Sequence, residues 1–363
     1  MPRLRDLIPD HIRSLPPYPK GRPWRRGEEV VRLSSNENPL GPPPMAVAAI
    51  QGVLQEVNRY PDGAAEELLN ELARHLGVGV ENLVLGNGSD EVIEMAVKIF
   101  VREGDEVIIP APSFAYYRIA SASEGARPVE VPLKDYRIDL HEVICRLTPR
   151  TKLIFLNNPN NPTGTIFTRR EFRSFLEDLP EGVLLVIDEA YGEYVTSPEY
   201  PDYRDYLALE RPILVLRTFS KFYGLAGLRV GYGIAKEEII SALEKVHQPF
   251  NVNLLGAVGA LGALRDEEYQ RRSSLVNEEG KRYLSEGLRR LGVSFVPSEA
   301  NFLLVRIGEG VEELLERLGE ARVVVRDMKG YGLEGHLRVS IGLPDENRRF
   351  LEVLERWKTS SSP

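Results

Sequence analysis

The sequence predicts an α/β protein in which a large domain, with a mostly parallel sheet flanked by helices, precedes a smaller α/β domain at the C-terminus. Apolar strand-like segments alternate with amphipathic helical segments between residues 105 and 246, as in sheets whose strands are joined by crossover helices. Loops rich in polar residues and glycine follow several of these strands, where open α/β sheets bind their ligands. A chain of 363 residues is also long enough for two packed domains.

The composition is ordinary for a globular protein and argues against several functions. The net charge is −8, from 46 Lys and Arg against 54 Asp and Glu, which argues against a general nucleic-acid binder. No apolar run is long enough to predict a membrane span, and the first residues lack the apolar core of a signal peptide. The single cysteine, Cys145, fits a reducing compartment, so a cytoplasmic location is expected. The five histidines show no ligand spacing, and no metal site is predicted.

The first hundred residues predict an irregular arm and the first elements of the large domain. Residues 1–29 are rich in proline and arginine, which favours a non-regular segment. We expect a strand at 30–33 and helices at 46–57 and 64–76, the second ending at Gly77. A strand at 82–85 then leads through a glycine-containing loop into a helix at 91–101.

That loop, from Gly86 to Asp90, is a candidate anion site. Gly88 permits close approach of the backbone, and the helix start at Ser89 and Asp90 offers N–H groups with partial positive charge. The alternative is plain capping of the helix by Ser89 or Asp90. The loop lacks the third glycine of a dinucleotide fingerprint and the Gly-Lys of a P-loop, so a small phosphate fits it better.

Two candidate residues follow the next strands. Strands are predicted at 105–110, 128–131, 152–156 and 183–187, with helices at 140–147 and 168–179. Phe114 follows the first strand and can stack on a flat ring, although a core aromatic is the alternative. Asn161 lies in a proline-rich loop whose amides can hold a ring hydroxyl, although the same residues are common turn formers.

Asp188 stands at the C-terminal end of the strand at 183–187, in the segment Asp-Glu-Ala-Tyr that ends at Tyr191. A carboxylate at that position is costly unless it is paired or hydrogen-bonded. A protonated pyridine nitrogen is one partner that would justify it. The alternative is a turn or N-cap aspartate, which is common after strands.

Lys221 follows an apolar strand predicted at 212–217 and lies next to Thr218 and Ser220. Desolvation at the rim of a sheet lowers the pKa of a lysine, and the neutral amine can then attack a carbonyl group. The hydroxyls can donate to an anion whose charge Arg229 balances. A surface lysine after a strand is the alternative.

The remainder of the chain predicts the end of the large domain and the small domain. The large domain is predicted to end with a strand at 228–234 and helices at 236–246 and 253–264, and a long helix at 267–291 follows. The small domain is then predicted to contain strands at 293–296, 302–307, 323–326 and 337–341, and helices at 311–318 and 345–357. The tail from 359 is expected to be irregular. Arg338 lies in an apolar strand, where a guanidinium needs an anionic partner, and Arg326 is a second candidate that a salt bridge with Asp327 would also explain. The expected division is an arm (1–29), packed with the small domain (266–363), and a large domain (30–265).

Taken together, Asn-Pro-Thr-Gly, Asp-Glu-Ala-Tyr and Ser-Lys-x-x-Gly-Leu-Ala-Gly-Leu-Arg resemble one family in order and spacing. They are similar to the fold-type I, pyridoxal 5'-phosphate (PLP)-dependent aminotransferases of class I/II, and within them to the histidinol-phosphate aminotransferases. The resemblance runs from about Leu15 to the last helix.

The resemblance implies roles for individual residues. Lys221 attaches the cofactor and moves the proton, Asp188 keeps the ring nitrogen protonated, and Tyr191 contacts the ring oxygen together with Asn161. The other implied cofactor contacts are Gly88, Ser89, Asp90, Phe114, Thr218, Ser220, Arg229 and, from a second subunit, Tyr60. The implied substrate contacts are Tyr18, Asn36, Arg326 and Arg338.

The implied activity is transfer of the amino group of L-histidinol phosphate to 2-oxoglutarate by a homodimer, in histidine biosynthesis. Threonine-phosphate decarboxylases and aromatic amino-acid aminotransferases resemble the same motifs and stay open as alternatives. A PLP-binding regulator is a further alternative from another class. Such regulators carry an added DNA-binding domain, for which the short arm leaves no room.

Overall fold

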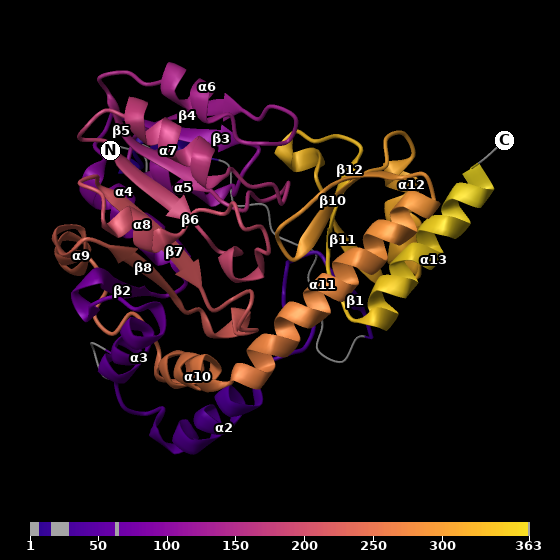
Figure 1. The fold of residues 1–363 in the computed structure, drawn as a ribbon, viewed down its shortest axis with the longest axis horizontal. Coiled ribbons are helices and arrows are strands. Elements are labelled where there is room, and N and C mark those ends of the chain that lie inside the picture. Colours follow the sequence, from indigo (N-terminus) through magenta and orange to yellow (C-terminus); the bar gives the residue numbers. More distant parts are fainter. Residues whose placement is uncertain (1–6, 16–28, 62–64, 362–363) are drawn as a thin grey trace.

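The structure is a computed structural model that describes residues 7–15, 29–61 and 65–361. Figure 1 shows two sheets side by side, with the long helix α11 (Glu267–Arg290) running from the larger unit to the smaller one. The larger sheet has the strand order β2-β8-β7-β6-β5-β3-β4, and the smaller has the order β1-β11-β12-β10-β9. Tyr18 lies outside the described residues, so its predicted role is not tested.

The larger sheet is mostly parallel. Its strands are β2 (Leu83–Gly86), β3 (Glu106–Ala111), β4 (Arg127–Pro132), β5 (Thr151–Asn157), β6 (Leu184–Asp188), β7 (Ile213–Thr218) and β8 (Gly231–Ala235). Only β8 runs antiparallel to its neighbours β2 and β7. Asn157 at the end of β5 is in register with Asp188 at the end of β6. The polar residues that follow β5, β6 and β7 therefore meet at one edge of the sheet.

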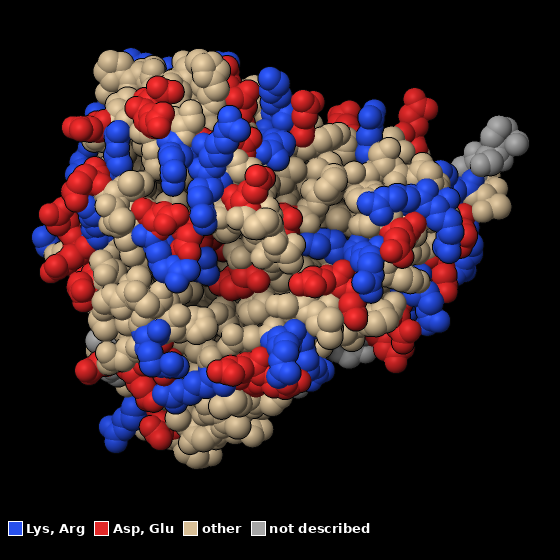
Figure 2. Space-filling model, viewed as in Figure 1, with Lys and Arg blue, Asp and Glu red and all other residues tan. Residues whose placement is uncertain are grey.

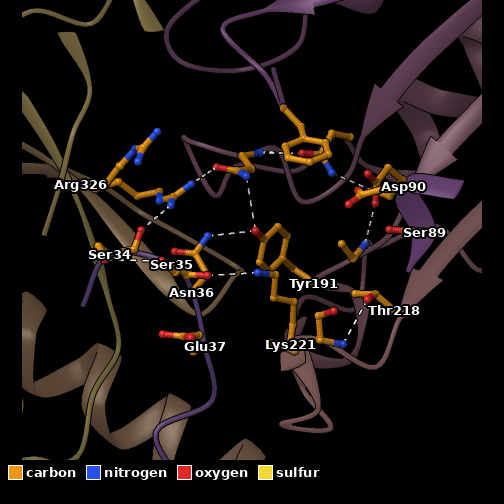
Figure 3. Close-up of a pocket in the computed structure, with 18 of the residues that line it drawn as sticks. Ser34, Ser35, Asn36, Glu37, Ser89, Asp90, Tyr191, Thr218, Lys221 and Arg326 are labelled. Carbon is orange, nitrogen blue, oxygen red and sulfur yellow. Dashed lines mark hydrogen bonds between the residues drawn. The ribbon is translucent and has the colours of Figure 1, made fainter. Parts of the chain in front are cut away.

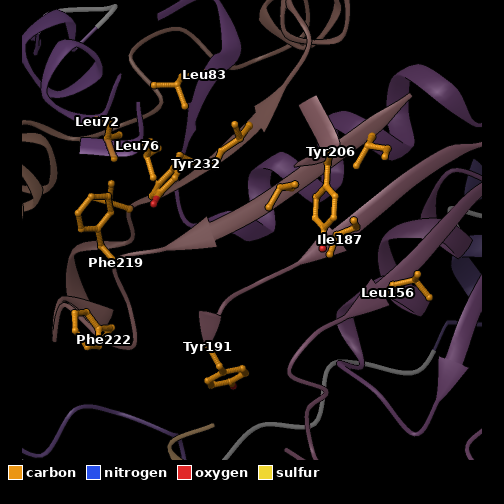
Figure 4. Close-up of a cluster of buried hydrophobic side chains, with 14 of the residues drawn as sticks. Leu72, Leu76, Leu83, Leu156, Ile187, Tyr191, Tyr206, Phe219, Phe222 and Tyr232 are labelled. Carbon is orange, nitrogen blue, oxygen red and sulfur yellow. The ribbon is translucent and has the colours of Figure 1, made fainter. Parts of the chain in front are cut away.

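Helices cover both faces of this sheet (Figure 1). They are α2 (Pro44–Val53), α3 (Glu66–Leu76), α4 (Ser89–Phe100), α5 (Tyr116–Ser123), α6 (Leu140–Cys145), α7 (Arg169–Asp178), α8 (Tyr203–Leu207), α9 (Glu237–Glu244) and α10 (Leu254–Arg265). Along β6, Leu184 and Val186 join one apolar cluster, whereas Leu185 and Ile187 join the other, part of which is drawn in Figure 4. Burial on both faces explains why this strand is apolar without alternation.

The smaller unit packs three helices on its sheet. Its strands are β1 (Val31–Leu33), β9 (Ser294–Val296), β10 (Phe302–Arg306), β11 (Val323–Asp327) and β12 (His336–Ser340), and its helices are α11, α12 (Val311–Glu320) and α13 (Pro344–Ser361). Leu303, Val339 and Phe350 are fully buried in its core. β1 comes from the N-terminal part of the chain but pairs in parallel with β11. The proposed domain boundary at residue 266 stays a prediction, and β1 lies on the small-domain side of it in space.

The predicted α/β class is confirmed, and two local predictions are wrong. The strand predicted from residue 228 begins at Gly231, because residues 226–228 form a 3-10 turn and Arg229 has a left-handed backbone with φ +56°. The tail predicted to be irregular from 359 continues α13 to Ser361. There the Thr359 hydroxyl donates to the Glu355 carbonyl, and Arg317 donates to the Ser360 hydroxyl.

The surface carries both signs of charge. On the face shown in Figure 2, Lys and Arg side chains alternate with Asp and Glu side chains over both units. This mixture differs from the continuous basic stripe of a nucleic-acid-binding face. In the part of the chain that the structure describes, no helix has the length and apolar character that a membrane crossing requires.

A buried charge cluster lies under the end of β6. Glu189 is fully buried, and its carboxylate pairs with the Arg217 guanidinium at 2.6 Å, while Glu193 contacts the same guanidinium at 3.4 Å. Burial raises the pKa of Glu189 to about 7 despite the pull of Arg217. Two carboxylates therefore depend on one cation for compensation.

Replacement of Arg217 by alanine is expected to lower the free energy of unfolding by about 3–5 kcal/mol, because it leaves buried carboxylates uncompensated. Urea denaturation measures this loss. Arg204→Ala is the control, since Arg204 pairs with Asp202 on the surface, where an ion pair contributes little to stability. If both substitutions lowered the free energy of unfolding equally, the buried Arg217 cluster would stabilise the fold no more than a surface ion pair does.

Candidate active site

A cavity of about 360 Å³ lies at the carboxyl ends of β5, β6 and β7, between the two sheets. The larger unit contributes the residues that follow its strands, and the smaller unit contributes Arg326, Tyr331 and Arg338. The segment 34–37 passes between them (Figure 3). The cavity brings together thirteen of the predicted residues: Asn36, Ser89, Asp90, Phe114, Asn161, Asp188, Tyr191, Thr218, Ser220, Lys221, Arg229, Arg326 and Arg338.

One end of the cavity is an anion cradle at the start of α4. Gly88 has φ +79°, a backbone conformation that favours glycine, and a Cβ there would lie 2.5 Å from the Arg229 guanidinium and displace it. The Arg229 guanidinium donates to the Ser220 hydroxyl at 3.3 Å and to the Asp90 carboxylate at 2.9 Å. The N-terminus of the 12-residue helix α4 adds N–H groups and a partial positive charge. Asp90 thus contributes through the arginine that it holds, because its carboxylate offers no donor.

Asp188 is buried, with two donors on its carboxylate. The Tyr117 hydroxyl donates to Oδ2 at 2.5 Å, and the backbone N–H of Ala190 donates to Oδ1 at 3.0 Å. Burial raises the pKa of Asp188 to about 6, and the two hydrogen bonds oppose that rise. Near neutral pH the carboxylate is therefore ionised and suited to pair with a cationic group.

Tyr117 is a site residue that the sequence did not single out. It lies three residues after Phe114, and their rings meet edge to face with centroids 5.4 Å apart. The predicted elements did not include α5, which places Tyr117 against the end of β6. The spacing of three residues between Phe114 and Tyr117 was the one signal in the sequence that the two side chains lie together. The contact of Tyr117 with Asp188 depends on how α5 packs.

Tyr191 is held by amides from both units. Its hydroxyl accepts from the side-chain amide of Asn36 at 2.9 Å and from that of Asn161 at 3.4 Å. Asn36 has φ +55° and is buried, and its amide oxygen accepts from the Ser340 hydroxyl at 3.0 Å. Because the Tyr191 oxygen accepts both bonds, its proton is available for donation into the cavity. Asn36, predicted as a substrate contact, also orients this phenol.

Lys221 points into the cavity between its two ends (Figure 3). Its ammonium donates to the carbonyl of Ser35 at 3.1 Å. Burial and, to a smaller extent, the positive charge of Arg338 lower the pKa of Lys221 to about 8. A substantial fraction of the amine is therefore neutral, and nucleophilic, near physiological pH.

The other end of the cavity carries two arginines. Arg326 of β11 is the register partner of Arg338 of β12, which places both guanidinium groups on one face of the smaller sheet. The Arg338 guanidinium donates to the Asn161 amide oxygen and to the Ser34 carbonyl at 2.8 Å. Two adjacent cations are favourable where an anion binds both. The cavity thus has arginine side chains at each end, with Lys221 between them.

Tyr60 lies away from the cavity. It is 82% exposed, and its ring stacks on that of Phe250 with centroids 4.6 Å apart. Within this chain it is not one of the residues that line the cavity. Tyr331, which lies under the Arg326 guanidinium at 5.9 Å from the ring centroid, is a lining residue that the sequence did not indicate.

Comparison with known proteins agrees with this geometry. The sequence profile of the aminotransferase class I and II family matches residues 28–354, and the chain belongs to that family. It is 43% identical over 361 residues to the histidinol-phosphate aminotransferase of Moorella thermoacetica, covering 98% of this chain and 92% of that protein.

Two solved structures share the fold over nearly their full length. The histidinol-phosphate aminotransferase of Sinorhizobium meliloti in complex with pyridoxal-5'-phosphate has a TM-score of 0.87 at 27% identity, covering 98% of each chain. The L-threonine-O-3-phosphate decarboxylase of Porphyromonas gingivalis has a TM-score of 0.79 at 25% identity, covering 90% of this chain and 99% of that one. The predicted family and fold are therefore confirmed.

Proposed function

We propose that the protein is a PLP-dependent transaminase that moves the amino group of L-histidinol phosphate to 2-oxoglutarate, giving imidazole acetol phosphate and L-glutamate in histidine biosynthesis. The observation that carries this proposal is the pair of anion sites on either side of Lys221. The Arg229 site suits a cofactor phosphate, and the pair Arg326 and Arg338 suits the phosphate of a substrate.

The residues present fit PLP. The cradle at Gly88 and Arg229 matches a small phosphate, and the ionised, buried Asp188 matches a protonated ring nitrogen. Phe114 offers a ring for stacking, and Tyr191 and Asn161 match a ring oxygen. Bound there, the cofactor supplies an electron sink for the bonds at the substrate's amine-bearing carbon.

The side chains of this chain then have distinct tasks. Neutral Lys221 would hold the cofactor, and its Nζ would accept and return the proton of the substrate's amine-bearing carbon. Asp188 holds the proton on the ring nitrogen. Tyr191 donates its phenol proton to the ring oxygen, oriented by the amides of Asn36 and Asn161. Arg338 and Arg326 bind the substrate phosphate.

A half-reaction tests the substrate assignment. The protein loaded with PLP should lose the visible absorbance of the bound cofactor when L-histidinol phosphate is added, and 2-oxoglutarate should restore it. Release of CO₂ from O-phosphothreonine, with no response to histidinol phosphate, would favour the decarboxylase alternative. A faster response to phenylalanine or tyrosine would favour an aromatic amino-acid aminotransferase.

Arg326→Gln is expected to raise KM for L-histidinol phosphate about 10- to 100-fold, because a charge-assisted hydrogen bond contributes about 1.5–3 kcal/mol. Steady-state kinetics with histidinol phosphate as the varied substrate measure the change. Arg306→Gln is the matched control, because Arg306 is an exposed arginine of β10 in the same sheet, and this change should leave KM unchanged. An unchanged KM in the Arg326 variant would remove that arginine from the phosphate site.

The low pKa of Lys221 predicts how PLP uptake depends on pH. Only the neutral amine attacks the cofactor aldehyde, so the rate of uptake by cofactor-free protein should rise with pH to a plateau, with a midpoint of about 8. Arg338→Gln removes a positive charge that lowers this pKa and should move the midpoint upward. Stopped-flow absorbance measures the rate. A midpoint near the ordinary lysine value of 10.5 in the unsubstituted protein would contradict the assignment.

We also propose a homodimer in which Tyr60 of each subunit reaches the cofactor phosphate of the other, and a cytoplasmic location. Support for the dimer is the exposure of Tyr60 and Phe250, whose rings stack on each other, together with the exposure of Leu54 and Val57. Light scattering after gel filtration tests the assembly.

A further inference from the structure

We propose that Tyr117 is a positioning residue for this reaction, whose phenol holds Asp188 ionised and aimed at the ring nitrogen of the cofactor. The inference deepens the proposed function and rests on it only for the identity of the cofactor. Neither the family motifs quoted above nor the predicted contacts include Tyr117.

The packing around the Tyr117 ring fixes the direction in which its hydroxyl points. The side chain is fully buried, and its ring stacks on Phe155 of β5 with centroids 4.5 Å apart and an interplanar angle of 7°. Phe114 meets the same ring edge to face at 5.4 Å. The ring is therefore clamped between two others, and its hydroxyl donates to Asp188 Oδ2 at 2.5 Å. That length is typical of a strong bond to a carboxylate.

The electrostatic surroundings show why Asp188 needs this donor. Burial disfavours its charged form, and the negative charge of Asp90 on α4 acts in the same direction. Lys221, in the loop after β7, favours the charged form, as do the bonds from Tyr117 and from the Ala190 N–H. Burial also raises the pKa of Tyr117 well above its usual value, so the phenol stays protonated and stays a donor throughout the working pH range.

Tyr117 also links two predicted cofactor contacts. One edge of its ring supports Phe114, which lines the cavity where the flat ring is proposed to lie, and its hydroxyl supports Asp188. Phenylalanine at position 117 would support the Phe114 ring equally well, but it could not donate a hydrogen bond to Asp188. The hydroxyl is therefore the part to test.

The experiment compares Tyr117→Phe with Tyr116→Phe. Tyr116 is the adjacent residue, and its hydroxyl donates to Glu94 rather than to Asp188, so its loss matches the change without touching the carboxylate. For each protein we would measure the affinity of the cofactor-free form for PLP and the pH dependence of the absorbance of the bound cofactor. The pH profile of kcat and the KM for histidinol phosphate complete the comparison.

For Tyr117→Phe we expect the acidic limb of the kcat profile to move up by about one pH unit, as the loss of one hydrogen bond to the ionised form requires. We expect weaker PLP binding, a kcat lowered about 10-fold at a pH on the acidic limb, and an unchanged KM. Tyr116→Phe should match the unsubstituted protein. If Tyr117→Phe has the same pH profile and PLP affinity as the unsubstituted protein, the inference is overturned while the proposed function stands.

A second variant covers the case in which Tyr117→Phe does not fold. Fluorotyrosine inserted at position 117 keeps the shape of the ring and makes the phenol a stronger donor, so the acidic limb should move to lower pH. A limb that does not move would overturn the inference. The absorbance and affinity measurements need no substrate, so they also separate this inference from the choice of histidinol phosphate. A protein that binds no PLP at all would overturn both proposals.

Discussion

Lys221→Ala should reduce transamination at least about 10⁴-fold while PLP binding persists. The variant loses the general base, whose contribution is typically about 10²–10⁴-fold, and also the covalent attachment of the cofactor. The anion cradle, Asp188 and Tyr191 are unchanged, so the cofactor should still bind. Single-turnover absorbance with histidinol phosphate measures the rate, and equilibrium dialysis measures the binding.

The control is Lys236→Ala, because Lys236 pairs with Glu210 at the surface of the larger unit, away from the cavity. It should retain full activity. Turnover of Lys221→Ala at a rate near that of the control would mean that another base carries the proton transfer, and the central assignment would fail.

Asp188→Asn should lower kcat about 10³-fold, because removal of one partner from a buried charge pair costs about 3–5 kcal/mol. The amide has the size of the carboxylate but cannot hold a proton on the ring nitrogen, so the electron sink weakens. The unsubstituted protein should lose activity only below about pH 6, because pairing with the cationic ring nitrogen lowers the pKa of Asp188 from the value of about 6 that it has in the cofactor-free site. The Asn variant should lack that acidic limb. A pH–rate profile of both proteins measures the two effects.

Asp178→Asn serves as the control, since Asp178 is an exposed aspartate at the end of α7. It should leave the rate and the acidic limb as they are. If the Asp188 variant kept most of its activity with the limb intact, the carboxylate would have no role at the ring nitrogen.

Many residues that line the cavity could be predicted from local sequence because of one geometric rule. Parallel strands end at the same edge of a sheet, so residues just after β5, β6 and β7 must lie close together although they are distant in the chain. Asn161, Asp188 and Lys221 were identified in this way, and all three line the cavity. The apolar strands were also readable, because burial on both faces requires an apolar residue at nearly every position.

Contacts that depend on the packing of distant segments could not be predicted from the sequence. Tyr117 reaches Asp188 because α5 packs on β3 and β4 and the Tyr117 ring lies over Phe155 of β5. A tyrosine in a short helix carries no mark of that contact. The bond from the Asn36 amide to Tyr191 was not predicted, because Asn36 also depends on Ser340 of β12, whose hydroxyl donates to its amide oxygen. Arg229 was predicted just inside a strand, whereas its left-handed backbone delays β8 to Gly231.

The sequence by itself determined the class of fold, the family and the chemistry of the main cavity residues, because apolar periodicity and strand-end motifs are local properties. Only the tertiary structure decided which side chains orient those residues and where β1 pairs. These features arise from contacts between segments more than 70 residues apart, such as Tyr117 with Asp188 and Asn36 with Ser340. Such contacts depend on the packing of the whole chain, which no local pattern encodes.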